Sequence, residues 1–384
     1  MAKKIDLYCE GNCWDPKVWS VIPYELATTL KKLGSLGNTY NVCTYENTSR
    51  VSNYTHMLPY IRVGGQGIYS LRNGNNPSYY EKRQKKALKI YESNPKPDSI
   101  ITIGHLAIFY KTPYFTLQDM DLNTVIKWRE NKKPTYMFDK IPLSLLKKSE
   151  IIQRKVYENA AGIFVSSEWV KNNICSYIDE PKKVFPTGIG HRYSAIQLTE
   201  EILEKRFENP VLLFVGKDGI RKGIDIVIEA FEQIKNEFKN MTLRIITKQN
   251  QLPRQIKHLI NNSPDIELYD SVEPERLAAM YTSSSLFLMP SRFEPFGKVF
   301  FEAMAFGLPV IGANSCAMPE FIIDDYNGYT PSARPEEVAK KIKKVFESFG
   351  KYKKLSKNAI VESNKYREEN VVKEMLTIID KYSI

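Results

Sequence analysis

No apolar run in this chain approaches the roughly 20 residues needed to cross a bilayer, although 42% of its 384 residues are hydrophobic. The first residues, Met1 to Leu7, also lack the apolar stretch and small-residue cleavage site of a signal peptide. The sequence therefore predicts a cytoplasmic protein that is soluble, or at most peripheral at the inner face of a membrane.

Cysteine and histidine are scarce as well. The five cysteines are odd in number, scattered, and without the paired two-residue spacing of a zinc site. We interpret them as reduced, mostly buried thiols, with a redox or metal role for Cys9 and Cys13 as the alternative. The sequence predicts no metal site and no bound cofactor.

The net charge of +11 is distributed unevenly along the chain. Residues 1–199 contain 28 Lys and Arg against 17 Asp and Glu, whereas residues 200–384 contain 27 of each. A basic first half suits an anionic partner such as a phosphorylated lipid, an acidic membrane surface or nucleic acid. A solvated, Lys-rich surface explains the same excess, and the two interpretations stay open.

The length fits two domains of about 150 to 200 residues each. In the second half, short apolar runs alternate with helical periods, which is typical of a parallel sheet covered on both faces. The predicted strands are 211–216, 242–247, 266–270, 286–290 and 309–313, and the predicted helices are 224–238, 253–261, 274–282 and 299–306. This pattern predicts a doubly wound, Rossmann-like α/β domain.

The first half repeats the alternation less regularly. Its predicted strands are 5–9, 41–45, 60–63, 99–103, 114–117 and 162–166, and its predicted helices are 19–33, 78–91, 143–160 and 169–178. We expect an N-terminal domain over 1–195, a C-terminal domain over 196–364, a hinge near residues 190–200, and a final helix over 365–384 that packs back across this hinge.

One loop of the second half combines glycines with cations. Residues 215–223 read Val-Gly-Lys-Asp-Gly-Ile-Arg-Lys-Gly, directly after a predicted strand and before a predicted helix. Gly216 permits close backbone approach, and Lys217 and Lys222 are placed to neutralise a diphosphate at the helix N-terminus. The loop is neither a Walker loop nor the Gly-x-Gly-x-x-Gly fingerprint, so it indicates neither a nucleoside triphosphatase nor a dehydrogenase.

A second loop and the predicted helix that follows it contain two glutamates, eight residues apart. Glu294 is followed by Pro-Phe-Gly, and Glu302 begins the run Glu-Ala-Met-Ala-Phe-Gly-Leu-Pro-Val. The whole segment resembles the signature of the retaining glycosyltransferases of family 4, the relatives of glycogen synthase and phosphatidylinositol mannosyltransferase. Residues 216–223 also resemble that family's phosphate loop, with Lys217 where the family usually has Arg.

The resemblance implies a GT-B fold, two Rossmann-like doubly wound domains facing a central cleft. It implies a metal-independent hexosyltransferase that uses a nucleotide-diphosphate sugar of the UDP or GDP type. Glu294 would contact the transferred sugar and Glu302 the ribose. The other residues implied in donor binding are Gly216, Lys217 and Lys222, the backbone of Phe296, Gly297, Lys298 and Val299, and Thr247, Lys248, Tyr269 and Ser271 beside the base.

The expected acceptor is a glycan or lipid hydroxyl bound in the first half. His105 ends a predicted strand where family members often keep a cleft histidine, and we carry it as a catalytic candidate beside its more ordinary structural role. Gly11 and Asn12 follow the first strand and are candidates for the acceptor side. Asp119-Met120-Asp121 imitates a metal-binding Asp-x-Asp, which we discount because the rest of the chain does not resemble the fold that uses it.

Three alternatives stay open. The first is a glycosyltransferase that acts on nucleic acid, which the basic half of the chain would bind. The second is a non-catalytic protein that binds nucleotide sugars. The third is a phosphorylase or epimerase of the same two-domain fold. The basic segments 82–89, 127–133 and 147–155 form either a membrane-surface patch or ordinary solvated helix faces.

Overall fold

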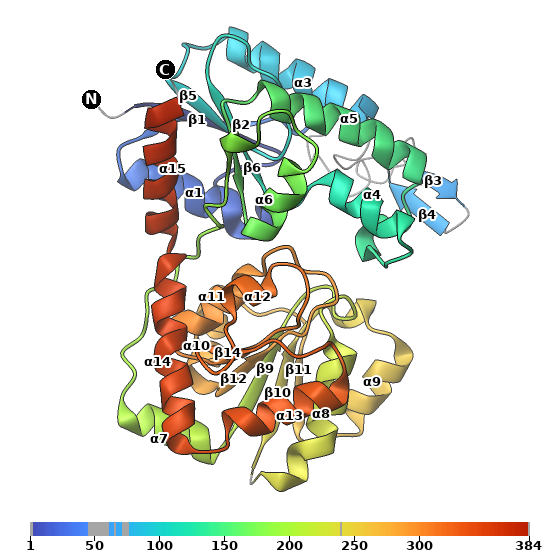
Figure 1. Ribbon diagram of the computed structural model, residues 1–384, viewed down its shortest axis with the longest axis vertical. Helices are drawn as coiled ribbons and strands as arrows, with labels where there is room; N and C mark the ends of the chain where they lie inside the picture. Colours follow the sequence, from blue (N-terminus) through green and yellow to red (C-terminus); the bar gives the residue numbers. More distant parts are fainter. Residues whose placement is uncertain (1–2, 45–60, 65–66, 71–76, 239, 383–384) are drawn as a thin grey trace. The chain divides into compact units, whose positions relative to one another are not determined.

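The computed structural model describes residues 3–44, 61–64, 67–70, 77–238 and 240–382, with backbone alone for 61–64, 67–70 and 137 (Figure 1). The chain divides into two compact units. The first comprises Met1–Gly190 together with Glu368–Ile384, and the second comprises His191–Arg367. Each unit has its own parallel sheet, so we describe them one at a time.

The first unit is built on a six-stranded sheet in the order β2-β1-β5-β6-β7-β8, parallel throughout. Its main strands are β1 (Ile5–Cys9), β2 (Leu36–Asn41), β5 (Ser99–Ile103), β6 (Tyr114–Gln118), β7 (Gly162–Val165) and β8 (Val184–Phe185). Its helices are α1 (Ile22–Lys32), α3 (Pro77–Glu92), α4 (Leu122–Glu130), α5 (Leu143–Asn159), α6 (Glu168–Cys175) and α15 (Glu368–Tyr382).

Apolar side chains on both faces explain why this sheet is parallel and covered by helices. Strands β1, β5, β6 and β7 are buried along their whole length, as the continuous apolar runs predict. One core cluster includes Tyr157 of α5 and Tyr91 of α3. The other includes Leu26 of α1 and Met375 of α15, so the last helix of the chain completes the N-terminal unit.

Two strand predictions for this unit need correction. The strand predicted at 41–45 is wrong, because β2 ends at Asn41 and residue 45 lies outside the described part of the chain. Residues 61–64 form β3 (Ile61–Gly64), which pairs antiparallel with β4 (Gly67–Ser70) in a separate two-stranded sheet. The predicted final helix over 365–384 corresponds to α15, which begins at Glu368, after α14 has ended at Lys365.

The second unit has the strand order β11-β10-β9-β12-β13-β14, again parallel throughout. Its strands are β9 (Val211–Val215), β10 (Thr242–Ile246), β11 (Ile266–Tyr269), β12 (Leu286–Leu288), β13 (Val310–Ile311) and β14 (Gly328–Tyr329). Its helices are α7 (Glu200–Glu208), α8 (Ile224–Ile234), α9 (Arg254–Asn261), α10 (Pro274–Ser283), α11 (Lys298–Ala305), α12 (Met318–Phe321), α13 (Pro335–Val345) and α14 (Phe349–Lys365).

Helices flank both sheets (Figure 1), which confirms the predicted α/β class with two Rossmann-like domains. In the second unit, each predicted strand and helix overlaps an observed one, although the sequence analysis did not predict β14 or the helices α7, α12, α13 and α14. Because all strands of a parallel sheet share one direction, their carboxyl ends lie along one edge, where ligands of such folds usually bind. That edge of the second unit contains both loops that the sequence singled out.

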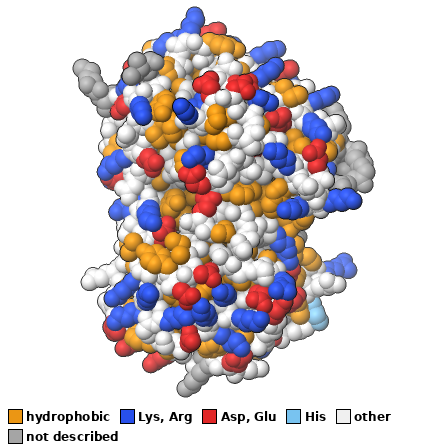
Figure 2. All heavy atoms as spheres, in the orientation of Figure 1, with side chains coloured by type: hydrophobic (Ala, Val, Ile, Leu, Met, Phe, Trp, Pro, Cys, Tyr) orange, Lys and Arg blue, Asp and Glu red, His pale blue; other side chains and the backbone are white. Residues whose placement is uncertain are grey.

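Surface charge is spread over both units. The first unit contains 29 Lys and Arg against 21 Asp and Glu, and the second contains 26 against 23. Figure 2 shows blue and red side chains interspersed on the drawn face rather than one continuous basic patch. Among the described residues, no helix is both long and apolar enough to cross a bilayer.

Candidate functional site

The candidate donor site lies at the carboxyl edge of the second sheet, where the loops after β9 and β12 touch each other. Gly223 makes this approach possible, and Gly216 makes room for Lys222 within the β9 loop. A Cβ on Gly216 would overlap the side chain of Lys222, and a Cβ on Gly223 would lie 2.5 Å from the carbonyl oxygen of Pro290. Gly223 also has φ +83° at the N-cap of α8, a conformation that side-chain-bearing residues rarely adopt. The glycine spacing of the loop is therefore a packing requirement.

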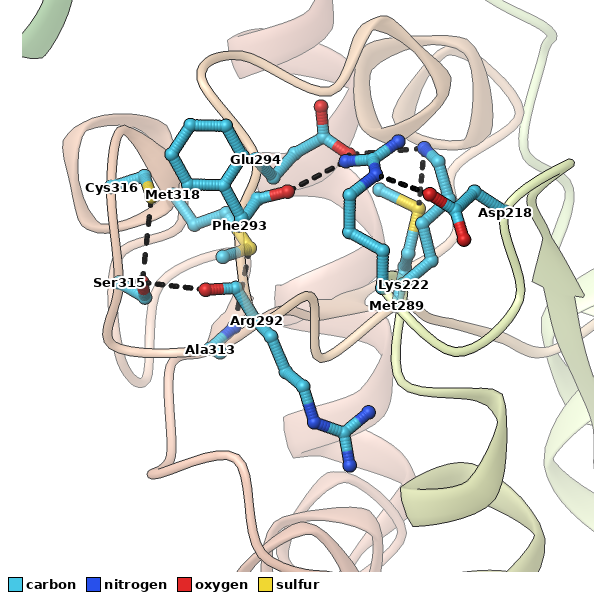
Figure 3. Close-up of polar contacts among 11 residues, drawn as sticks. Asp218, Lys222, Met289, Arg292, Phe293, Glu294, Ala313, Ser315, Cys316 and Met318 are labelled. Atoms are coloured by element: carbon cyan, nitrogen blue, oxygen red, sulfur yellow. Dashed lines mark hydrogen bonds and ion pairs between the residues drawn. The ribbon is translucent and has the colours of Figure 1, made fainter. Parts of the chain in front are cut away.

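Glu294 lies at the centre of a buried ion cluster (Figure 3). Its side chain is about as buried as a core residue, at 8% exposure, and its Oε2 atom is 3.0 Å from Lys222 Nζ. Arg221 Nη1 lies 3.4 Å from the same oxygen. Among the described residues, no group donates a hydrogen bond to the other oxygen, Oε1.

The charge state of Glu294 follows from these neighbours. Burial raises the pKa of the carboxyl, but the nearby positive charges of Lys222 and Arg221, with their hydrogen bonds, outweigh burial and hold the pKa below its usual range. Glu294 is therefore a carboxylate at neutral pH. A carboxylate only accepts hydrogen bonds, so Oε1 is suited to accept one from a hydroxyl group.

Arg221 is a functional candidate that the sequence analysis missed. Its guanidinium is buried, and it donates to the backbone carbonyl of Phe293 at 2.6 Å and to Asp218 Oδ2 at 3.0 Å. It thereby fixes the backbone next to Glu294 as well as the carboxylate itself. Lys217, by contrast, has an exposed side chain. In the sequence, a buried arginine and a solvated lysine of the same loop look alike.

Arg292 connects the two loops from the other side. Its guanidinium makes a paired ion contact with Asp225 of α8, with Nη1–Oδ1 and Nη2–Oδ2 distances of 2.8 and 2.6 Å. Its Nη1 also donates to the carbonyl of Ile220 at 2.6 Å, and its backbone N–H donates to the carbonyl of Arg221 at 2.9 Å. These bonds hold the β9 loop and the β12 loop in a fixed relation.

Helix α11 begins in the same loop. Gly297 caps it with φ +85°, and a Cβ there would lie 2.8 Å from the Phe300 ring. The first amides of a helix lack intrahelical partners and favour anions. The Phe296 ring is buried and stacks on Phe301 at 4.8 Å between centroids. Of the predicted donor-binding residues 296–299, Phe296 is thus available only through its backbone, while Lys298 and Val299 are half-buried.

Glu302 lies on α11 and is 9% exposed. Its Oε2 atom accepts a hydrogen bond from the hydroxyl of Tyr281 at 3.2 Å, and no described residue donates to Oε1. Burial, together with the adjacent Glu302 charge, raises the pKa of Tyr281 well above its ordinary value, so the tyrosine keeps its proton and remains a donor. The carboxylate therefore has one oxygen fixed by the protein and one left for a ligand.

The residues predicted to flank the base follow β10 and β11. Thr247 is buried, and its Oγ1 atom has no hydrogen-bond partner among the described residues, while its backbone N–H donates to the Tyr269 carbonyl at 3.0 Å. The side chains of Lys248 and Ser271 are exposed. Tyr269 is half-buried, and its hydroxyl donates to Glu267 at 3.0 Å. An unpaired buried hydroxyl is uncommon, which makes Thr247 the most informative of these four.

In the first unit, the predicted acceptor-side residues lie at the carboxyl edge of their own sheet. His105 follows β5 and is half-buried, and its Nδ1 atom lies 3.1 Å from Gln153 Nε2. Gly11 follows β1 with φ +116°, and its N–H donates to Asn41 Oδ1 at 3.0 Å. Asn12 Oδ1 accepts from the N–H of Trp14 at 3.0 Å, which shapes the same loop.

Two motifs with metal-binding alternatives have structural explanations. Asp121 caps α4, where its carboxylate accepts from the Thr124 N–H at 2.9 Å. Cys9 and Cys13 are buried with their sulfur atoms 3.0 Å apart. Within the residues that the structure describes, no three His, Cys, Asp or Glu side chains form a group that could hold a metal ion.

Comparison with known proteins finds relatives of the segment that contains this site. Residues 196–361 match the family model described as glycosyl transferases group 1. An uncharacterised glycosyltransferase of Methanocaldococcus jannaschii is 27% identical over 228 residues, which cover 59% of this chain and 61% of that protein. The chain spans about half to three fifths of the length of these curated relatives.

Solved structures share the whole fold at low sequence identity. Sucrose-phosphate synthase from Thermosynechococcus elongatus superposes with a TM-score of 0.73 at 16% identity, covering 99% of both chains. HepE from Anabaena, solved with UDP and glucose, has a TM-score of 0.66 at 14% identity over 98% of this chain and 99% of its own. The GT-B fold is thus confirmed, and its second unit contains the segment that matches the group 1 model.

Proposed function

We propose that this protein transfers a hexose from a UDP- or GDP-type nucleotide-diphosphate sugar to an acceptor hydroxyl with retention of configuration. The observation that carries the proposal is the Glu294 carboxylate, buried between Lys222 and Arg221 in the segment that matches the group 1 model. HepE, a neighbour of the same fold, was also solved with UDP-glucose, the kind of donor proposed here.

In this proposal, the donor diphosphate lies over the β9 loop and the start of α11. Lys222 and the first amides of α11 neutralise its charge, which grows as the bond to the sugar breaks. Within the cluster, Glu294 and Asp218 offset part of the positive charge of Lys222 and Arg221, so the exposed Lys217 and the helix amides add to the attraction of Lys222 for an anion.

Glu294 acts on the sugar itself. Because its lowered pKa keeps it ionised, its free oxygen accepts a hydrogen bond from a sugar hydroxyl and stabilises positive charge that develops on the sugar ring. Glu302 binds the ribose hydroxyls through its own free oxygen. The acceptor, a glycan or lipid hydroxyl, enters on the same face of the sugar that the diphosphate leaves, and the departing phosphate oxygen takes the acceptor proton.

Transfer from labelled UDP- and GDP-hexoses to a glycan panel tests the proposal, with the anomeric configuration of the product read by NMR. Glu294→Gln should reduce turnover at least about a hundredfold, because it removes one charge placed for the transition state. Glu336→Gln, which makes the same change at an exposed position of α13, is the matched control. Near-normal turnover by Glu294→Gln, or an inverted product, would contradict the proposal.

A further inference from the structure

The segment that joins the β1 loop to α1 contains three consecutive left-handed residues. Trp19, Ser20 and Val21 have φ angles of 45°, 53° and 72°, and none of them is glycine. This conformation is disfavoured for L-residues, most of all for a β-branched one such as Val21. Strained backbone of this kind persists where surrounding structure holds it, and it concentrates at ligand-binding sites.

The strained turn places an indole ring at the ligand edge of the first sheet. A Cβ added to Gly104 would lie 3.9 Å from Trp19 Cη2, so the ring lies close above Gly104, the residue before His105. Gly104 is itself held in place, because its carbonyl accepts hydrogen bonds from the hydroxyls of Thr102 and Thr116 at 2.9 and 3.1 Å. Both the turn that carries Trp19 and the backbone of Gly104 next to its ring are therefore held in place.

The Trp19 side chain contributes little to the packing of the first unit. Its side chain is 42% exposed, and within the described part of the chain it makes no hydrogen bond or aromatic contact. Trp14, five residues earlier and 40% exposed, differs: its Nε1 donates to Thr39 at 3.1 Å, and Lys31 lies 5.6 Å over its ring. Among the described residues, the Trp14 indole thus has a hydrogen-bond partner and a cation over its ring, whereas the Trp19 indole has neither.

The face of an indole ring carries partial negative charge, which attracts the polarised C–H bonds on the face of a pyranose ring. His105 follows Gly104 directly in the chain, and its imidazole is held by Gln153 at Nδ1 and by the Tyr80 ring, 6.3 Å away between centroids. A single ring beside such a polar group suits a sugar better than a membrane, since interfacial anchoring needs a broader apolar face.

We propose that the Trp19 indole, held above Gly104 by the left-handed turn, is the platform on which the acceptor stacks, and that the acceptor therefore carries a pyranose ring. The inference rests on the proposed glycosyl transfer and narrows its acceptor from any hydroxyl to a sugar. Trp19 binds and orients the acceptor, so its loss should affect acceptor affinity rather than the chemical step.

Fluorine NMR of the full chain labelled with 5-fluorotryptophan tests the binding directly. The chain contains four tryptophans, and Trp19→Phe assigns the Trp19 resonance by removing it. The probes are the methyl α- and β-pyranosides of glucose, galactose and mannose, and separately vesicles of phosphatidylcholine with phosphatidylglycerol. We expect a saturable shift of the Trp19 resonance with at least one glycoside.

No shift of the Trp19 resonance with any glycoside, in protein that still binds UDP, would overturn the inference and leave the proposed function standing. A shift with vesicles alone would overturn it in favour of a membrane contact. Failure of the wild-type protein to bind any donor nucleotide would refute the proposed function, and the inference would fall with it.

Kinetics with the glycoside identified in this way give a second test. Trp19→Ala should raise the acceptor KM about tenfold, the scale of one lost ring contact, with kcat little changed, and Trp19→Phe should restore part of the affinity. Trp14→Ala is the matched control, and its KM should stay near that of the wild type. An acceptor KM unchanged by Trp19→Ala, with UDP affinity intact, would contradict the proposal.

Discussion

Replacing Lys222 with methionine isolates the positive charge that the account assigns to the donor diphosphate. Methionine keeps most of the length of the side chain and preserves apolar contact near Met289 Sδ, which lies 3.3 Å from Lys222 Nζ. What is lost is one ammonium group, 3.0 Å from Glu294 Oε2. The substitution therefore changes charge with little change in volume.

The effect can be estimated from both roles of the ammonium group. A hydrogen bond to a charged group contributes about 1.5 to 3 kcal/mol, so UDP or GDP affinity should fall about 10- to 150-fold. Removing one partner of a buried ion pair costs about 3 to 5 kcal/mol when the remaining charge is left alone. Because Arg221 still lies 3.4 Å from Glu294, we expect a smaller loss of unfolding free energy, about 1 to 3 kcal/mol.

Calorimetric titration with the nucleotide and urea unfolding measure the two quantities separately. Lys340→Met makes the same charge change on the exposed surface of α13 and serves as the control. A Lys222→Met protein that is folded and binds the nucleotide within about threefold of the wild type would refute the placement of the diphosphate over the β9 loop.

Four further results are expected. Burial lowers the pKa of His191 to about 4. The unfolded chain therefore takes up a proton at His191 below about pH 6.5, while the folded chain does not. Because of this difference, the unfolding free energy should drop by about 2 kcal/mol between about pH 7.5 and 5. In urea melts, His191→Gln should remove most of that drop. Glu302→Gln should weaken UDP binding about tenfold without weakening binding of inorganic diphosphate, because it removes a ribose contact only. An equal loss of affinity for both ligands would contradict that role. Gly223→Ala should lower the unfolding free energy by at least about 1 kcal/mol because of its φ of +83° and the Pro290 carbonyl, whereas Gly350→Ala, with open space around it, should not. Turnover should survive EDTA; complete loss that added Mg²⁺ or Mn²⁺ restores would show that the proposed metal-independent mechanism is wrong.

Strands buried on both faces were predictable because their residues are apolar without interruption. The strand at 211–215 has this property, and the structure confirms it. The edge strand β2 was misplaced because its sequence, Leu-Gly-Asn-Thr-Tyr-Asn, is polar and only partly buried. Such a strand is defined by its pairing with β1, a non-local contact that the local pattern does not contain.

The candidate site was predictable where glycines and charges fall in one short segment. Glu294 and Lys222 come from loops 72 residues apart, and the resemblance rather than their spacing brought them together. Arg221 was missed because nothing in the sequence distinguishes a guanidinium that donates to Phe293 from a solvated one. The unpaired hydroxyl of Thr247 also becomes visible only when burial is known.

The central claim is a donor-nucleotide site at the carboxyl edge of the second sheet. Calorimetric titration of the purified protein with UDP and GDP, with ADP for comparison, tests it most directly. The account predicts saturable binding of UDP or GDP at one site, weakened about tenfold or more in Glu302→Ala. Absence of binding by both nucleotides, or binding that Glu302→Ala leaves unchanged, would contradict it.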